Sequence, residues 1–226
     1  MRVIASWSGG KDSCLALHKA REAGHEPGCL LNFLSKEFGR CCFHGIAADL
    51  MRAQADCLGI GIVQPLVSQD MGAYEQEFKE AVLRLKEEPG ACGMVFGDVY
   101  LDEHRTWVER VCAEVGIEPI EPLWGMPADS VVREFIAAGF KAVVVSAKAD
   151  LFGRDDVGRA FDTSFLDLLK ERKICPCGEN GEFHTFVVDG PLFQRRIGIK
   201  KSRAVLKKGF WEHWFLDIQE WEASDK

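Results

Sequence analysis

Short apolar runs and amphipathic stretches alternate along the first half of the chain. Apolar runs typical of buried strands occur at residues 3–5, 28–34, 60–67, 94–96 and 117–123. Between them, apolar residues recur at helical spacing over 14–20, 46–58, 74–85 and 107–115. Strands separated by single helices form a parallel sheet that is covered on both faces. We therefore expect a doubly wound, Rossmann-like α/β domain over residues 1–125.

The pattern changes beyond residue 125. We expect a helix around 131–136, a β-branched strand at 142–145 and a helix from about 162 to 173. Residues 182–222 alternate as antiparallel strands do, and Asp189-Gly190-Pro191 is typical of a turn. The sequence therefore predicts a smaller α+β domain over residues 126–226, packed closely on the first domain.

The composition is that of a globular protein without a membrane span. Of the 226 residues, 47% are apolar and 28% are charged. The formal net charge of −7 argues against extensive nucleic-acid coating, which needs many basic side chains. The chain shows no leader and no apolar run of membrane-spanning length, so we expect a cytoplasmic protein. The nine scattered cysteines then indicate reduced thiols.

A hexapeptide between the first expected strand and the first helix is suited to binding phosphate. Its residues are Ser8, Gly9, Gly10, Lys11, Asp12 and Ser13. Adjacent glycines allow a tight turn and close approach of backbone N–H groups, and a helix N-terminus favours an anion. Lys11 adds a mobile positive charge, and the two serines add hydroxyl donors.

The spacing distinguishes between kinds of phosphate loop. A G-x-x-x-x-G-K-[ST] loop would need glycine where Ala5 stands and a hydroxyl where Asp12 stands, and a G-x-G-x-x-G pattern is absent. The motif S-G-G-K-D-S resembles the pyrophosphate loop of the N-type ATP pyrophosphatases. That resemblance implies cleavage of ATP between its α and β phosphates.

Polar residues follow other strands at the same expected edge of the sheet. In such sheets ligands bind beyond the carboxyl ends of the strands, near the point where the strand order reverses. Carboxylates there can hold Mg²⁺ against ATP, and Arg105 can neutralise charge on a leaving group. Asp12 and Asp98 are the expected magnesium ligands. Glu103 could equally favour the dipole of the helix that it begins. The expected nucleotide-binding set adds Asn32, His44, Gly97, Asp98, Glu103 and His104 to the loop.

A second polar stretch runs from Cys177 to Phe186. It carries Glu179, Glu182 and His184 beside glycines, just before an expected strand. Short polar groups in such a place can be aimed into a site from a rigid neighbour. We expect these three side chains to orient a substrate or to move a proton, although a solvated loop is the plain alternative.

Together these motifs resemble the diphthine–ammonia ligase family of pyrophosphate-loop enzymes. The matching features are G-D-x-x-x-D-E-H-R-x-W from Gly97, E-P-L-W from Glu121 and G-E-N-G-E-F-H-T from Gly178. The resemblance implies an adenine-nucleotide-hydrolase-like domain followed by a smaller domain that helps to close the site. It also implies ATP-dependent amidation, by ammonia, of the carboxylate of diphthine, a modified histidine in elongation factor 2, with AMP and pyrophosphate as products.

The last motif departs from the family pattern. Members with the diphthamide role tend to have E-G-G-E-[FY]-E-T, whereas this chain has Asn180 in place of a glycine and His184 in place of an acidic residue. A branch with a different carboxylate acceptor therefore stays open.

The mechanism that we expect needs no side-chain nucleophile. Attack of the acceptor carboxylate on the α-phosphorus would release pyrophosphate and leave an acyl-adenylate, from which ammonia displaces AMP. Lys11, the loop N–H groups and Mg²⁺ would stabilise the departing pyrophosphate. Glu179, Glu182 and His184 would orient the acceptor or deprotonate ammonium.

Two other functions and the oligomeric state remain open at this point. A tRNA-modifying enzyme of the same superfamily would suit the basic segment 195–208, which contains no acidic residue. A module that binds adenine nucleotides without turnover would need fewer carboxylates around the phosphates. A homodimer is possible.

Overall fold

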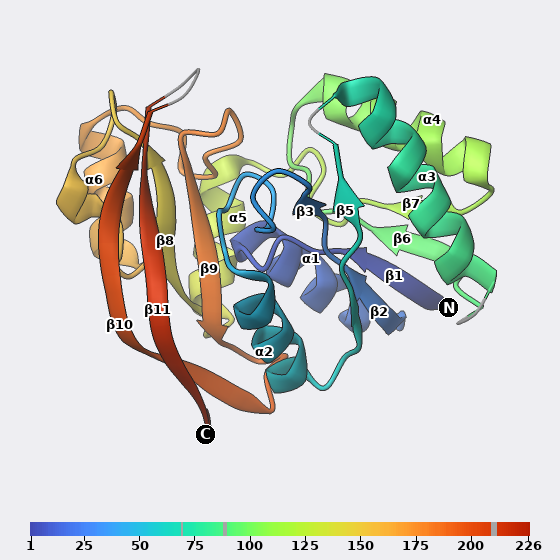
Figure 1. The fold of residues 1–226 in the computed structure, drawn as a ribbon, viewed down its shortest axis with the longest axis horizontal. Helices are drawn as coiled ribbons and strands as arrows, with labels where there is room; N and C mark the ends of the chain where they lie inside the picture. The colour runs from blue at the N-terminus through green and yellow to red at the C-terminus, as the bar shows by residue number, and fades with distance from the viewer. Residues whose placement is uncertain (69, 88–89, 209–211) are drawn as a thin grey trace.

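The chain folds around two sheets with helices between them. The computed structural model describes residues 1–68, 70–87, 90–208 and 212–226. A five-stranded parallel sheet and a four-stranded antiparallel sheet stand on either side of helices α1 and α2 (Figure 1). Within the described ranges, no helix is long and apolar enough to cross a bilayer.

The parallel sheet has the doubly wound topology that the sequence predicts. Its strand order is β4-β2-β1-β6-β7, so the chain moves outward in one direction from β1 and then returns to the other side of it. All four strand pairs are parallel. The strands are β1 (Arg2–Ser6), β2 (Glu26–Leu31), β4 (Ile62–Val63), β6 (Gly93–Val95) and β7 (Glu118–Ile120). The predicted fold class is confirmed, and the strand order reverses between β1 and β6.

Alternating side chains of the parallel strands enter two separate cores. Ile4 belongs to a core with α3 (Met71–Glu87) and α4 (Asp102–Val115). Val3 and Ala5 belong to the other core, with α1 (Lys11–Glu22) and α2 (Ala48–Leu58). This alternation is expected of a strand that is buried on both faces.

Two predicted strands are shorter than expected. The run 60–67 is divided into β4 and β5 (Leu66–Val67), and the run 28–34 ends as β2 before β3 (Leu34–Ser35) begins. β3 and β5 pair with each other in a separate two-stranded sheet. Pro65 has no N–H to donate to a ladder, which explains why the longer strand is interrupted.

The second half of the chain forms the antiparallel sheet that the alternation predicts. Its order is β10-β11-β8-β9, and all its strand pairs are antiparallel. Its elements are α5 (Ala128–Ala137), β8 (Lys141–Lys148), a 3-10 helix (Arg154–Asp156), α6 (Thr163–Glu171), β9 (Phe183–Asp189), β10 (Arg195–Lys207) and β11 (His213–Asp225). The turn at 189–191 does not close a hairpin, because β9 pairs with β8 and β10 pairs with β11. Residues 209–211 of the predicted strand region lie outside the described residues.

One hydrophobic core serves both sheets. The core that contains Val3 and α1 also contains Phe135 of α5, Phe165 of α6 and Phe186 of β9. The division into residues 1–125 and 126–226 stays a prediction, and the shared core means that the two parts are packed as one body.

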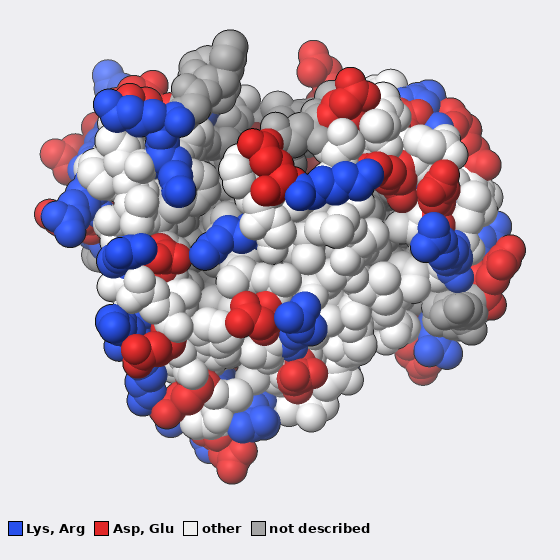
Figure 2. Space-filling view, viewed as in Figure 1, with Lys and Arg blue, Asp and Glu red and all other residues white. Residues whose placement is uncertain are grey.

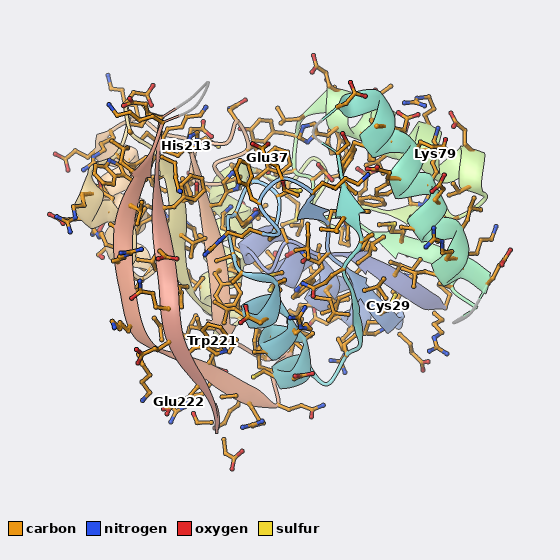
Figure 3. All side chains as sticks on the ribbon, viewed as in Figure 1. Cys29, Glu37, Lys79, His213, Trp221 and Glu222 are labelled. Atoms are coloured by element: carbon orange, nitrogen blue, oxygen red, sulfur yellow. The ribbon has the colours of Figure 1, made fainter. Side chains whose placement is uncertain are left out.

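The basic segment 195–208 is neutralised by the strand beside it. Glu222, near the lower end of β11 in Figure 3, pairs with Lys200. The cross-strand ion pairs are Lys200–Glu222 at 2.5 Å, Lys201–Glu220 at 3.5 Å and Arg203–Asp217 at 3.1 Å. Basic and acidic side chains are correspondingly interspersed over these strands in Figure 2. The segment is therefore not a single-sign surface of the kind that binds nucleic acid.

The side chain of Gln54 connects the two halves of the molecule. It is fully buried on α2, and its Oε1 accepts a hydrogen bond from the indole N–H of Trp7 at 2.9 Å. Its Nε2 donates to the carbonyl oxygens of Gly9 at 3.0 Å and Val187 at 2.6 Å. Gln54 thus links the end of β1, the Ser8–Ser13 loop and β9.

We predict that Gln54→Ala lowers the free energy of unfolding by about 2–6 kcal/mol, because the Trp7 indole and the Val187 carbonyl both lose their buried partner. Urea unfolding of the whole chain measures this loss. Gln76→Ala is the matched control, since Gln76 is exposed on α3 and bonds only Glu80 in the next turn; we expect a change within about 0.5 kcal/mol. Equal effects of the two substitutions would contradict the assigned role of Gln54.

Candidate active site

The Ser8–Ser13 loop joins β1 to α1 at the point where the strand order reverses. Ser8 Oγ lies 3.2 Å from Ser13 Oγ and accepts a hydrogen bond from the N–H of Gly10 at 3.3 Å. Ser13 Oγ also donates to the carbonyl oxygen of Gly10 at 3.1 Å. These bonds hold both hydroxyls beside the N-terminus of α1, where the helix dipole favours an anion.

Both glycines of the loop are required by the space around them. Gly9 has φ +73°, and a Cβ there would lie 2.6 Å from Oε1 of Gln54. A Cβ on Gly10 would lie 2.9 Å from Nε2 of His44. The loop therefore has to be glycine at these positions to pass between α2 and the segment that carries His44.

The second sheet fixes the conformation of the loop. The N–H of Lys11 donates to Thr185 Oγ1 at 3.0 Å, and the N–H of Val187 donates to the carbonyl oxygen of Gly9 at 2.9 Å. Neither Thr185 nor Gln54 was in the predicted site. A polar residue in the apolar stripe of α2 was the one sequence signal that could have indicated Gln54.

The side chain of Lys11 is not the mobile charge that the sequence suggested. It is only 4% exposed, and its amino group donates to Asp12 Oδ2 at 2.7 Å and to the carbonyl oxygen of Cys177. The same group faces the rings of Phe161 and Phe183, 5.9 and 5.3 Å from their centroids. Burial lowers the pKa of Lys11, but the charges of Asp12, Cys177 and Glu179 and the hydrogen bond to Asp12 together outweigh it, so the pKa is raised and the group stays protonated.

Three predicted carboxylates from distant segments interact at the loop. Burial raises the pKa of Asp12, the charge of Lys11 lowers it, and the charge of Asp98 raises it further. Burial, with a smaller contribution from Asp12, raises the pKa of Glu179 to about 7. Glu179 Oε2 accepts a hydrogen bond from the N–H of Val99 at 3.2 Å, which holds the segment 177–182 against the end of β6.

Asp12 and Asp98 can hold Mg²⁺ only if a bound molecule supplies further coordinating oxygens. Oδ1 of Asp12 is buried and has no hydrogen-bond partner among the described residues. No group of three or more histidine, cysteine or acidic side chains in the described ranges could hold a metal ion alone. Mg²⁺ at nucleotide sites is typically held by one or two carboxylates together with phosphate oxygens. Asp12 and Asp98 fit that requirement.

Two imidazole rings border the loop on its other side. The rings of His44 and His184 are 4.5 Å apart between centroids. Burial lowers the pKa of His44 to about 4, and burial together with the neighbouring His44 lowers the pKa of His184 well below its usual value. Both rings are therefore neutral near pH 7.

The start of α4 packs directly on the loop. A Cβ on Gly97 would lie 2.9 Å from the carbonyl carbon of Asp12, so only glycine allows this approach. Asp98 Oδ1 lies 3.0 Å from Nδ1 of His104, and this hydrogen bond raises the pKa of His104. Glu103 is exposed in the first turn of α4, where its charge favours the helix dipole.

Arg105 is engaged away from the loop. Its Nε donates to Glu109 Oε1 at 2.7 Å, and its guanidinium lies 5.0 Å from the ring of Trp124. Both partners are outside the loop, so the structure does not bring Arg105 to the phosphate site.

The side chains of Asn32 and Glu182 hold the protein around the site in place through hydrogen bonds. Asn32 is 1% exposed; its Nδ2 donates to the carbonyl oxygen of Trp7 at 2.9 Å, and its Oδ1 accepts from Gln64 at 3.1 Å. Glu182 accepts from the backbone N–H of Asn180 at 3.0 Å and so fixes the turn of the segment 177–182. In this structure the side-chain groups of both residues contact the protein itself.

All nine cysteines lie in the described part of the chain, and each has a free thiol.

Comparison with known proteins assigns the family. Residues 1–119 match the family described as diphthamide synthase N-terminal domain, and residues 127–221 match the diphthamide synthase C-terminal domain. The diphthine–ammonia ligase of Mus musculus is 27% identical over 91% of this chain and 85% of its own length. That of Schizosaccharomyces pombe is 26% identical over 91% of this chain, which spans 37% of that protein.

A solved structure, described as a predicted subunit of tRNA methyltransferase from Methanocaldococcus jannaschii, has a TM-score of 0.47 and 20% identity. The match covers 84% of this chain and 97% of that chain. A likeness of this degree carries no conclusion about function.

The two family matches together cover most of the chain, in the order that the sequence motifs predict. They confirm the expected family and, with the names of the curated relatives, the expected class of enzyme, a ligase. The chain belongs to the diphthamide synthase family.

Proposed function

We propose that this protein is an ATP-dependent amide ligase that activates a carboxylate as an acyl-adenylate and transfers it to ammonia. The observation that carries the proposal is the convergence of Asp12, Asp98 and Glu179, from three distant segments, on a glycine loop at the switch point of the sheet. Family membership supports the same reaction.

In the first step, an oxygen of the acceptor carboxylate attacks the α-phosphorus of ATP. The bond from this phosphorus to the oxygen that bridges it to the β-phosphorus breaks, and its electron pair leaves with pyrophosphate. The N–H groups at the start of α1 and the hydroxyls of Ser8 and Ser13 receive the pyrophosphate. Bound Mg²⁺, held by Asp12 and Asp98, would supply positive charge to the phosphates.

In the second step, ammonia attacks the acyl carbon and AMP departs with the electron pair of the carbon–oxygen bond. The attacking nitrogen must lose a proton. Glu179 is suited to accept it, because a carboxylate whose pKa is about 7 can both take up and release a proton near neutral pH. The rest of the segment 177–182 holds Glu179 in place, with Lys148 donating to the carbonyl oxygen of Asn180 at 2.8 Å.

The proposed acceptor is the carboxylate of diphthine. The curated relatives are named diphthine–ammonia ligase, and two neutral imidazoles lie beside the loop, His44 from the segment between β3 and α2 and His184 from β9. A neutral imidazole N–H can donate to a carboxylate, so His184 can serve an acidic acceptor even where relatives carry an acidic residue. Paired charges on β10 and β11 remove the main support for the tRNA-modifying alternative.

We predict that Asp12→Asn lowers the rate of AMP and pyrophosphate formation at least about a hundredfold, because a carboxylate that would hold Mg²⁺ against the phosphates is lost. Product analysis with diphthine-bearing elongation factor 2, ammonia and magnesium-ATP measures it. Asp102→Asn is the matched control, since Asp102 is exposed at the start of α4, and it should retain the wild-type rate. Release of ADP and phosphate by the wild-type protein would refute the scheme.

We predict that, at a fixed concentration of free ammonia, kcat/KM for ammonia rises with pH and levels off above about 7, as Glu179 becomes ionised. Glu179→Gln should lower the rate at least about a hundredfold and remove this rise, because the amide cannot accept the proton. Glu171→Gln, an exposed change at the end of α6, should keep the wild-type profile. An unaltered profile in Glu179→Gln would exclude Glu179 as the base.

A further inference from the structure

Three neighbouring strands place a row of side chains beside the phosphate loop. Phe215 of β11 pairs with Ser146 of β8, and Ser146 pairs with His184 of β9. Directly paired residues of antiparallel strands point to the same face of a sheet. This row, Phe215, Ser146 and His184, lies on the face that turns toward the segment between β3 and α2, which runs beside β9 in Figure 1.

The tip of that segment, residues 42–45, covers the row. The ring of His44 lies 4.5 Å from that of His184, and a Cβ on Gly45 would lie 2.8 Å from Cδ1 of Phe215. The tip also adjoins the phosphate loop, because a Cβ on Gly10 would lie 2.9 Å from Nε2 of His44. These contacts leave no room between the tip and the row, so a group reaches the row only when the tip moves away, and it is then next to the loop that receives the phosphates.

Two buried polar atoms in this place have no hydrogen-bond partner. Ser146 is 0% exposed, and its Oγ is unpartnered among the described residues, as is the buried Nδ1 of His44. Burying a polar group without a partner is costly, and such groups call for an explanation. Ser146 pairs with His184, whose ring contacts that of His44, so a ligand bound here can supply both missing partners.

The tip itself is strained and presents an aromatic ring. The N–H of His44 donates to the carbonyl oxygen of Cys42 at 2.7 Å, which closes a three-residue turn around Phe43 at φ +62°. This is a turn that few residues other than glycine adopt, and the side chain of Phe43 is 78% exposed. Strain of this kind persists where the surrounding structure imposes it and is concentrated at sites of function.

We propose that the row Phe215, Ser146 and His184, together with His44 of the tip, is the subsite for the carboxylate-bearing end of the acceptor, and that Ser146 Oγ–H donates to that carboxylate. The proposal rests on the proposed ligase function and names where its acceptor binds. Phe215 and the imidazoles supply an uncharged wall, and the hydroxyl of Ser146 and a ring N–H supply donors. Ser146 is a positioning residue for the acceptor.

The test uses Ser146→Ala, which removes the hydroxyl with little change of volume. Calorimetric titration with diphthine-bearing elongation factor 2 should show acceptor binding about tenfold weaker or more, as expected for loss of one hydrogen bond to a charged group. ATP binding should match that of the wild type. Ser202→Ala, an exposed change on β10, is the matched control and should alter neither affinity.

The stability of the protein without ligand distinguishes a positioning role of Ser146 from a structural role. Because Ser146 Oγ has no protein partner, Ser146→Ala should leave the urea midpoint unchanged or raise it. His44→Phe, which keeps a ring against His184 and removes both nitrogens, should weaken acceptor binding in the same way.

Three outcomes would overturn the assignment. If Ser146→Ala lowers the urea midpoint while acceptor affinity stays at the wild-type value, the hydroxyl is structural. If both variants bind the acceptor as the wild type does, the subsite lies elsewhere while the ligase function stands. If the wild-type protein neither binds this acceptor nor forms AMP with it, the proposed function and the subsite both fail.

Discussion

The carbonyl oxygen of Gly9 is the atom on which the rest of the structure depends. It accepts hydrogen bonds from the N–H of Val187 on β9 and from the side chain of Gln54 on α2. The parallel sheet supplies the strand and the helix that flank the loop, but the path of the loop between them is fixed from the other sheet. The shape of the Ser8–Ser13 loop is therefore a property of the whole chain, and the core that runs through both sheets supports it.

The contacts between the loop and the second sheet also determine where the charged side chain of Lys11 lies. Lys11 is directed out of the loop and into the second sheet, where it faces Asp12 and the carbonyl oxygen of Cys177. A buried ammonium beside two half-buried carboxylates, Asp12 and Glu179, is tolerated because each charge has an opposite neighbour. In the proposed mechanism, positive charge toward the phosphates comes from backbone N–H groups and from any bound metal, whereas Lys11 bonds the segment that carries Glu179.

Local patterns in the sequence predicted much of the fold and of the candidate site. The glycine loop, the alternation of strands and helices, and the polar residues after β6 and before β9 could be read from spacing, because each depends on neighbours in the chain. The direction of Lys11 and the internal bonding of Asn32 depend on contacts across the fold. Gln54 and Thr185 were missed for the same reason, since one buried polar residue in an apolar stripe does not reveal its distant partners. The basic run on β10 was misleading because its acidic partners lie on a strand that is adjacent only in space.

The two outer strands of the antiparallel sheet are protected from further strand addition in different ways. The edge of β9 is occupied, because the N–H of Val187 donates to Gly9 of the Ser8–Ser13 loop and its carbonyl oxygen accepts from Gln54 of α2. The edge strand β10 is long and open, but it carries lysine and arginine side chains at most of its exposed positions and irregular register near Lys201. These features oppose pairing between the β10 strands of two molecules, since like charges would then face each other. The basic run thus helps to keep a long exposed strand from templating aggregation.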